Sequence, residues 1–121
     1  MNVKKIQKIL KNFAKDRNWE QFHSLKNLAI SISIESSELL EHFQWEKNCQ
    51  EKLKINKNKQ KVSDEVADIM LYLLRFSDIA KINIEEACLT KIKKNEKKYP
   101  VKLCKGKSIK YTELKKIKKI S

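Results

Sequence analysis

The sequence predicts an all-α protein, a single four-helix bundle, from its length, its composition and its lack of turn residues. The chain has 121 residues, enough for one hydrophobic core but not for two. Hydrophobic residues make up 40% of it and charged residues 36%, a balance typical of globular proteins. It contains one glycine and one proline, too few for the tight turns of a β-sandwich or an α/β fold.

Apolar residues recur at helical spacing in the first half of the chain. Their spacing predicts a first helix over residues 3–17, followed by the aromatic-rich segment RNWEQFHS. Ser24 is a suitable N-cap and predicts a second helix over residues 25–43. Residues 46–62 are rich in Asn and Lys, and we expect a long loop or a short frayed helix there.

Capping residues also mark two helices in the second half. Ser63 predicts the N-cap of a third helix that continues to about Ile79. Asn83 followed by Glu86 resembles a capping box and predicts a fourth helix that ends near Tyr99, just before a proline. Short connections between helices are typical of a helical bundle.

Basic residues are concentrated in two segments. The net charge is +13, but residues 91–121 carry 13 Lys against two Glu, and residues 46–62 carry six Lys against two Glu. We expect a helical domain over residues 1–100 and an extended basic C-terminal tail over residues 101–121. A solvated surface explains most of these lysines, and the others could attract a polyanion such as a triphosphate. No nucleic-acid-binding motif is visible, so we expect no specific nucleic-acid partner.

Three observations predict a cytoplasmic protein without a membrane partner. The apolar runs are shorter than the ~20 residues of a transmembrane helix. The N-terminal residues lack the continuous apolar stretch of a signal peptide. The three cysteines are odd in number and form no CxxC pair, which favours reduced thiols over disulfides or zinc ligands.

Four carboxylates interrupt the apolar faces of the second and third predicted helices. ESSE places Glu35 three residues before Glu38, and EVAD places Glu65 three residues before Asp68. This spacing puts both members of a pair on one helical face. Residues 66–74 are otherwise almost wholly apolar, so we expect Asp68 to be shielded from water and protonated, ion-paired or metal-bound. Two facing pairs would suit Mg²⁺ or Mn²⁺ rather than zinc.

Other interpretations of these acids stay open at this point. Acids near a helix start are common caps, and Glu65 could be only that. A ferritin-like di-iron centre also uses helix carboxylates, but it requires Glu-x-x-His pairs. Neither His23 nor His42 follows a glutamate of the two pairs at that spacing.

The segments around these acids resemble a known family. ESSE, 26 intervening residues and EVAD are similar to the ExxE…ExxD signature of the MazG-like all-α nucleoside triphosphate pyrophosphohydrolases. RNWEQFHSLKNLAISISIESSELLEHFQW, DEVADIMLYLL and NEKKYPVKLCKGKSIKYTEL resemble the dCTP pyrophosphatase branch of that family. The resemblance covers about residues 4–114. The signature alone is moderately specific, and its combination with WEQFH and KKYPV is highly specific.

The resemblance implies roles for particular residues. Glu35, Glu38, Glu65 and Asp68 would bind Mg²⁺ or Mn²⁺, and Glu38 is our choice for the catalytic base. Trp19 and Trp45 would stack on the base, although tryptophans are more often core or interface residues. Lys91, Asn95 and Lys98 share a helical face that could meet the phosphates or the sugar, or could simply be solvated. The predicted substrate-binding residues are Trp19, Glu20, Gln21, Phe22, His23, Trp45, Tyr72, Lys91, Asn95 and Lys98.

Two positions depart from the family pattern. Leu10 stands nine residues before Trp19, where members of this branch can carry a histidine that contributes to the nucleotide site. This substitution leaves the base preference open. Ile34 precedes Glu35 where the broader family has a further glutamate, a change that the dCTP pyrophosphatase branch tolerates.

The resemblance implies hydrolysis of a (deoxy)nucleoside triphosphate, dCTP or a modified dCTP, to its monophosphate and pyrophosphate. Cleavage requires neutralisation of the phosphate charge and an oriented water, and carboxylate-held metal ions can supply both. The alternatives are a broad-specificity NTP pyrophosphatase and a non-catalytic nucleotide-binding regulatory protein. A helical site without lids usually takes residues from a neighbouring chain, so we expect a homodimer or a homotetramer.

Overall fold

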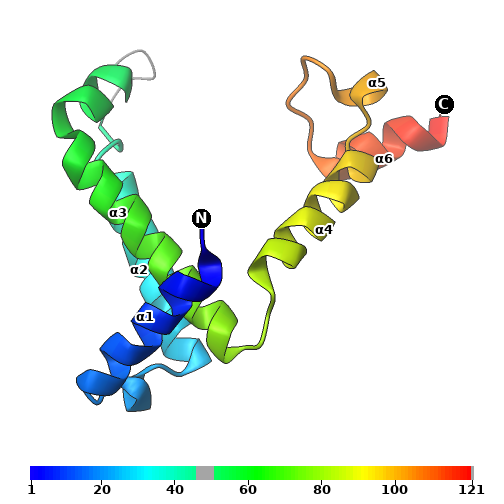
Figure 1. Ribbon diagram of the computed structural model, residues 1–121. Helices are drawn as coiled ribbons and strands as arrows, with labels where there is room; N and C mark the ends of the chain where they lie inside the picture. Colours follow the sequence, from blue (N-terminus) through cyan, green and yellow to red (C-terminus); the bar gives the residue numbers. More distant parts are fainter. Residues whose placement is uncertain (46–50, 121) are drawn as a thin grey trace. The chain divides into compact units, whose positions relative to one another are not determined.

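The computed structural model describes residues 1–45 and 51–120. These residues form helices and contain no strand, which confirms the all-α prediction. The chain divides into two compact units, Met1–Asn83 and Ile84–Ser121. The elements shown in Figure 1 are α1 (Val3–Asp16), the 3₁₀ helix η1 (Glu20–Phe22), α2 (Leu25–Glu41), α3 (Glu51–Ile79), α4 (Ile84–Lys98), α5 (Val101–Cys104) and α6 (Tyr111–Ile120).

The first two long helices begin at polar caps. Asn2 Oδ1 accepts a hydrogen bond from the Lys5 N–H (3.0 Å) at the start of α1. Ser24 Oγ accepts one from the Asn27 N–H (3.1 Å), which confirms Ser24 as the N-cap of α2. Such side-chain acceptors satisfy backbone donors that have no partner within the helix.

Helix α3 is longer than the sequence predicts. It begins at Glu51 and is kinked at Asn58, where φ is −124° and ψ is 30°. Ser63 therefore lies inside α3, and the prediction that it caps a helix is wrong. Lys and Gln are good helix formers and outweigh the asparagines of this segment, while Asn58 is a poor one and coincides with the kink. Residues 46–50 of the expected loop lie outside the described residues.

The core of the N-terminal unit lies where α1 and α2 pack against α3 (Figure 1). Ala14, Leu28 and Leu74, one from each helix, are at most 1% exposed. The side chain of Gln7 on α1 donates a hydrogen bond to the Leu74 carbonyl on α3 (3.0 Å), so a polar contact reinforces the apolar packing. These contacts hold in place the two helices that carry the predicted acidic pairs.

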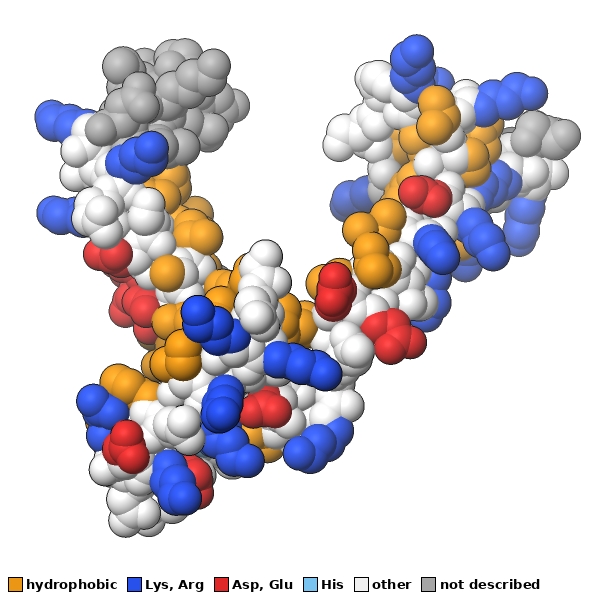
Figure 2. Space-filling model, viewed as in Figure 1, with side chains coloured by type: hydrophobic (Ala, Val, Ile, Leu, Met, Phe, Trp, Pro, Cys, Tyr) orange, Lys and Arg blue, Asp and Glu red, His pale blue; other side chains and the backbone are white. Residues whose placement is uncertain are grey.

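One side of α2 and α3 remains uncovered in the single chain. Ile30 and Ile34 on α2 are about half exposed, and so is Val66 on α3. Figure 2 shows hydrophobic side chains along the exposed side of α3. Asp68 is also exposed, so the prediction that neighbouring helices shield it is wrong for this chain on its own. The sequence pattern indicated an apolar helix correctly, but three packed helices leave part of it open.

The C-terminal unit contains α4, α5 and α6. Residues 101–121 were expected to be extended, and that prediction is wrong because α5 and α6 are helical. Leu114 on α6 is fully buried, and the Lys118 ammonium donates hydrogen bonds to the Lys97 and Lys98 carbonyls (3.2 Å each). A cation beside the last carbonyls of α4 stabilises that helix end. Gly106, between α5 and α6, has a φ of 75°, which glycine adopts without strain.

Two expectations about the chain's environment can be compared with the structure. No helix in the described ranges combines the length and the apolar character needed to cross a membrane. Cys88 and Cys104 are free thiols in the structure, and Cys49 lies outside the described residues. The prediction of a domain boundary at residue 100 stays a prediction.

Replacement of Leu74 by alanine should destabilise the N-terminal unit by about 2–5 kcal/mol, because a fully buried leucine loses its apolar contacts and leaves a cavity. Urea denaturation followed by circular dichroism would measure the loss. Leu40→Ala on α2 is the control, since Leu40 is 61% exposed and its loss should cost no more than about 0.5 kcal/mol. Equal effects of the two substitutions would contradict this description of the core.

Candidate active site

Three of the four predicted acids meet between α2 and α3. Glu35 and Glu38 come from successive turns of α2, and Glu65 comes from α3. One carboxylate oxygen of each lies within 4.8 Å of the others, and all three residues are partly buried. Glu65 thus faces Glu35 and Glu38, although it lies 30 and 27 positions further along the chain, and the fourth predicted acid, Asp68, is not in this cluster.

Two oxygens of this cluster are buried and lack a hydrogen-bond partner, Glu35 Oε2 and Glu65 Oε2. A buried polar atom without a partner is costly, and most such atoms in native proteins are satisfied. An oxygen left open in this way is available to a cation. Hard carboxylate oxygens suit Mg²⁺ or Mn²⁺, so the cluster could hold a divalent metal ion.

Crowding of the carboxylates also changes their protonation. Burial raises the pKa of Glu35 from 4.5 to about 7, with further contributions from the nearby Glu38 and Asp68. Burial likewise raises the pKa of Glu65, and Glu38 adds to this effect. His42 opposes it, because its Nε2 lies 3.8 Å from Glu65 Oε1. A bound cation would remove the repulsion that favours these protons.

Asp68 follows Glu65 by about one turn of α3 and lies between the acid cluster and an adjacent pocket. It is exposed and is not one of the three clustered acids. Its charge nevertheless contributes to the raised pKa of Glu35, so the two carboxylates are close enough to interact. Asp68 also lines the pocket, and it therefore links the acidic cluster to the apolar cavity.

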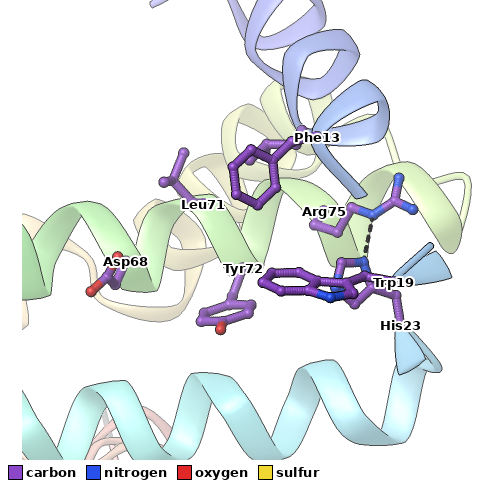
Figure 3. Close-up of a pocket in the computed structure, with 8 residues that line it drawn as sticks. Phe13, Trp19, His23, Asp68, Leu71, Tyr72 and Arg75 are labelled. Carbon is purple, nitrogen blue, oxygen red and sulfur yellow. Dashed lines mark hydrogen bonds between the residues drawn. The ribbon is translucent and has the colours of Figure 1, made fainter. Parts of the chain in front are cut away.

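The pocket is a cavity of about 330 Å³ between α1, the segment around η1, and α3 (Figure 3). Its walls are mostly aromatic and aliphatic, with a few polar side chains, as is typical of sites for small organic ligands. The residues that line it are Leu10, Phe13, Trp19, His23, Asp68, Leu71, Tyr72 and Arg75.

The chain after α1 places Trp19 in the wall of this pocket. Asn18 adopts a positive φ of 54°, and the Trp19 N–H donates to the Ala14 carbonyl (2.8 Å), which ends the helix. The Trp19 ring then meets the Phe13 ring edge to face, with centroids 5.8 Å apart. Trp19 remains 45% exposed, so one of its surfaces is free to contact a ligand.

Of the ten predicted substrate-binding residues, the pocket contains Trp19, His23 and Tyr72. Glu20 lines a neighbouring, more open cavity. The Gln21 side chain donates to the Asn18 carbonyl (3.0 Å), and Phe22 is 58% exposed. These residues shape the segment that carries Trp19 and His23 but do not line the aromatic pocket.

The other predicted contacts lie elsewhere. Trp45 is 88% exposed at the end of the first described range and does not line the aromatic pocket. Lys91, Asn95 and Lys98 are on α4 of the C-terminal unit. The Lys98 ammonium lies 4.2 Å from the centroid of the Tyr111 ring, which gives it a structural contact within that unit. A role of these four residues in substrate binding stays a prediction.

Sequence reasoning missed several lining residues, above all Arg75. Asp68, Leu71, Tyr72 and Arg75 are spaced at i, i+3, i+4 and i+7, so they follow one face of α3. This periodicity could have assigned Arg75 to the pocket. Phe13 is one of the apolar residues of the first predicted helix, and only the fold shows that it lines the cavity.

Comparison with known proteins identifies the family. A sequence model of the MazG-like family matches residues 30–114, which include all four predicted acids. The chain belongs to the MazG-like family. It is also similar to dCTP pyrophosphatase 1 of Rattus norvegicus and of Homo sapiens, with 32% identity over 111 residues in each case. These alignments cover 90% of this MazG-like chain, which spans 65% of the length of each relative.

A solved structure supports the same assignment. The crystal structure of a pyrophosphatase from Archaeoglobus fulgidus superposes on this MazG-like chain with a TM-score of 0.79 and 44% sequence identity. The match covers 83% of this chain and 94% of the archaeal one. The all-α fold of the MazG-like type, which the sequence predicted, is therefore confirmed.

The metal-free MazG-like protein should lose stability as the pH rises from 4.5 to about 7, the two pKa values of Glu35. Its folded-state pKa is raised, so the folded state binds the proton more tightly, and this stabilisation disappears as the proton is lost. Mg²⁺ should restore stability above this range, because it binds the deprotonated acids. Thermal melts across the range, with and without Mg²⁺, would measure both effects.

The variant Glu35→Gln provides the control for this prediction. It removes one titrating carboxylate, so the pH dependence and the response to Mg²⁺ should both decrease. A Mg²⁺ response that is equally large at both ends of the pH range would contradict the prediction.

Proposed function

We propose that this protein hydrolyses dCTP, or a modified dCTP, to the nucleoside monophosphate and pyrophosphate in the cytoplasm. The observation that carries the proposal is the position of two unpartnered glutamate oxygens beside an aromatic pocket, joined through Asp68. This arrangement suits a ligand with a polyanionic end and an aromatic end. The similarity to dCTP pyrophosphatase 1 and to an archaeal pyrophosphatase supports the reaction and the base.

The order of the site residues along α3 indicates how the substrate would lie in the site. Glu65, Asp68, Tyr72 and Arg75 follow one another at spacings of three or four residues. Ten residues of α-helix extend over about 15 Å, comparable with an extended nucleotide. We place the triphosphate at the Glu65 end and the base at the Trp19 and Arg75 end.

The acids divide into ligands and a base. Glu35 and Glu65 have oxygens without protein partners, and we assign them as metal ligands, with Asp68 joining them when substrate binds. A bound Mg²⁺ or Mn²⁺ would neutralise the phosphates and acidify the attacking water. A carboxylate oxygen of Glu38 lies within 4.8 Å of oxygens of the partly buried Glu35 and Glu65, so Glu38 can also reach the metal, and we assign it to accept the proton of that water.

The base would stack on Trp19, whose ring is half exposed beside Phe13. Stacking of a base on an aromatic side chain contributes about 1–3 kcal/mol in nucleic-acid complexes. Tyr72 and His23 supply polar atoms within the same pocket. Trp45, together with the α4 residues Lys91, Asn95 and Lys98, completes the proposed substrate contacts.

We further propose that the protein is a homodimer or a homotetramer. The exposed apolar residues Ile30, Ile34, Val66 and Met70 on α2 and α3 support this proposal, because contiguous exposed apolar surface marks interaction sites.

Hydrolysis of dCTP in the presence of Mg²⁺ should release pyrophosphate, and Glu38→Gln should lower kcat at least about 100-fold through loss of the general base. A pyrophosphate assay on a panel of deoxynucleoside triphosphates would measure activity and base preference. Asp16→Asn, at an exposed acid in the last turn of α1, is the matched control and should retain activity. Release of inorganic phosphate, or full activity of Glu38→Gln, would exclude the mechanism.

Light scattering should give a mass of two or four chains of 14.3 kDa. Ile30→Lys should shift the protein toward the monomer, because a charge in an apolar interface is costly to desolvate. Ser36→Lys introduces the same charge at another exposed position of α2 and should leave the mass unchanged. A fully active monomer would contradict the proposed assembly.

A further inference from the structure

We propose that Arg75 is a positioning residue for base recognition: it holds His23 as a neutral hydrogen-bond donor that binds an acceptor atom of the base. The proposal deepens the function proposed above and rests on it for the identity of the ligand. The hydrogen bond between Arg75 and His23 is present in the protein without a ligand, so it can be tested whether or not the protein hydrolyses dCTP.

The geometry fixes both side chains. The Arg75 Nε–H donates to His23 Nδ1 (3.2 Å), and this bond joins α3 to the segment between η1 and α2 (Figure 3). Arg75 is only 8% exposed, and its Nη1 lies 3.8 Å from Asp78 Oδ2. The guanidinium is therefore held from two sides, and its planar fork leaves little freedom to turn away from His23.

This contact selects one tautomer of His23. A neutral imidazole has one donor nitrogen and one acceptor nitrogen, whereas a guanidinium can only donate. Nδ1 accepts from Arg75, so Nε2 carries the proton of the neutral ring. An imidazolium would direct an N–H at the Arg75 N–H and place two positive charges together.

The surroundings of His23 also favour its neutral form. Burial lowers the pKa of His23, the charge of Arg75 lowers it further, and Glu20 opposes both to a smaller extent. Lys11, Glu20, Arg75, Asp78 and Lys81 are the charged residues that line the open polar cavity beside the ring. Three of these five side chains are cationic, so the balance around the ring disfavours a further positive charge.

The Arg75–His23 pair lies where the base would need polar recognition. Both residues line the aromatic pocket of about 330 Å³ and also the polar cavity of about 360 Å³. Helix α1 contributes only the apolar Leu10 and Phe13 to the aromatic pocket. At the end away from Asp68, the polar side-chain groups of the pocket are those of His23 and Arg75 and the indole N–H of Trp19.

The chemistry of a neutral donor indicates the class of base. His23 Nε2–H can bind a carbonyl oxygen or an unprotonated ring nitrogen. Cytosine offers both as adjacent acceptors, O2 and N3, whereas N3 of uracil and thymine carries a hydrogen. Uracil also offers carbonyl oxygens, so N3 is the acceptor that distinguishes the two bases. We therefore assign to Arg75 a part in the preference for dCTP over dUTP, through a hydrogen bond from His23 Nε2–H to N3 of cytosine.

The first test needs no substrate. The chain has two histidines, so nitrogen-15 spectra of histidine-labelled protein contain two imidazoles, and His42→Gln assigns them. We expect His23 of the wild-type chain to be the Nε2–H tautomer and to titrate below 6.5. An Nδ1–H tautomer, or titration at or above 6.5, would overturn the proposal. Absence of dCTP hydrolysis would instead refute the proposed function and leave this result standing.

The second test compares Arg75→Met with Arg75→Gln. The Gln Nε2 is attached to Cδ, as the Arg Nε is, so glutamine keeps a donor at the same place, while methionine only fills the space. In Arg75→Met we expect both tautomers of His23, a KM for dCTP raised by about 2- to 12-fold, as for loss of one hydrogen bond, and an unchanged kcat. The preference for dCTP over dUTP should decrease.

Arg75→Gln should retain the Nε2–H tautomer and a KM close to that of the wild-type chain. Equal behaviour of the two variants, or an effect on kcat alone, would show that Arg75 has only a structural role and would overturn the proposal. If Arg75→Met does not fold, the spectrum of Arg75→Gln decides, because loss of the tautomer there contradicts the mechanism and retention supports it.

Discussion

Mutual repulsion of three glutamates between α2 and α3 is the constraint on which the rest of the site depends. Two of their oxygens are buried without a partner, and burial raises the pKa of Glu35 to about 7. Such an arrangement opposes helix packing, so it persists only because apolar contacts around Leu28 and Leu74 hold the helices together. The clustered glutamates therefore lower the stability of the folded protein at the place where a cation can bind, as is common at functional sites.

Helix α3 connects the two ends of the site, the acidic cluster and the aromatic pocket. Its successive turns present Glu65 to the acidic cluster, Asp68 to the junction, and Tyr72 and Arg75 to the aromatic pocket. A continuous helix fixes the spacing between these groups better than loops would. The kink at Asn58 lies before this region, so the residues of the site belong to the uninterrupted part of the helix.

The basic C-terminal residues have structural roles that their charge alone did not reveal. The Lys98 and Lys115 ammonium groups lie 4.2 and 5.0 Å from the Tyr111 ring centroid, and Lys118 donates to carbonyls at the end of α4. These contacts explain part of the lysine excess through helix capping and cation–π packing. The positive charge of this unit is therefore weak evidence for a polyanionic partner.

The sequence by itself determined the helical class, the Ser24 cap and the pairing of Glu35 and Glu38 on one face, because helix propensity, capping and 3.6-residue periodicity are local properties. It could not place the start of α3, where propensity outweighed the apparent cap at Ser63, nor the folding of residues 101–120. Only the tertiary structure decided that Arg75 contacts His23, 52 residues away, and that Asp68 remains exposed. Such contacts depend on how helices pack, and local sequence patterns do not specify that packing.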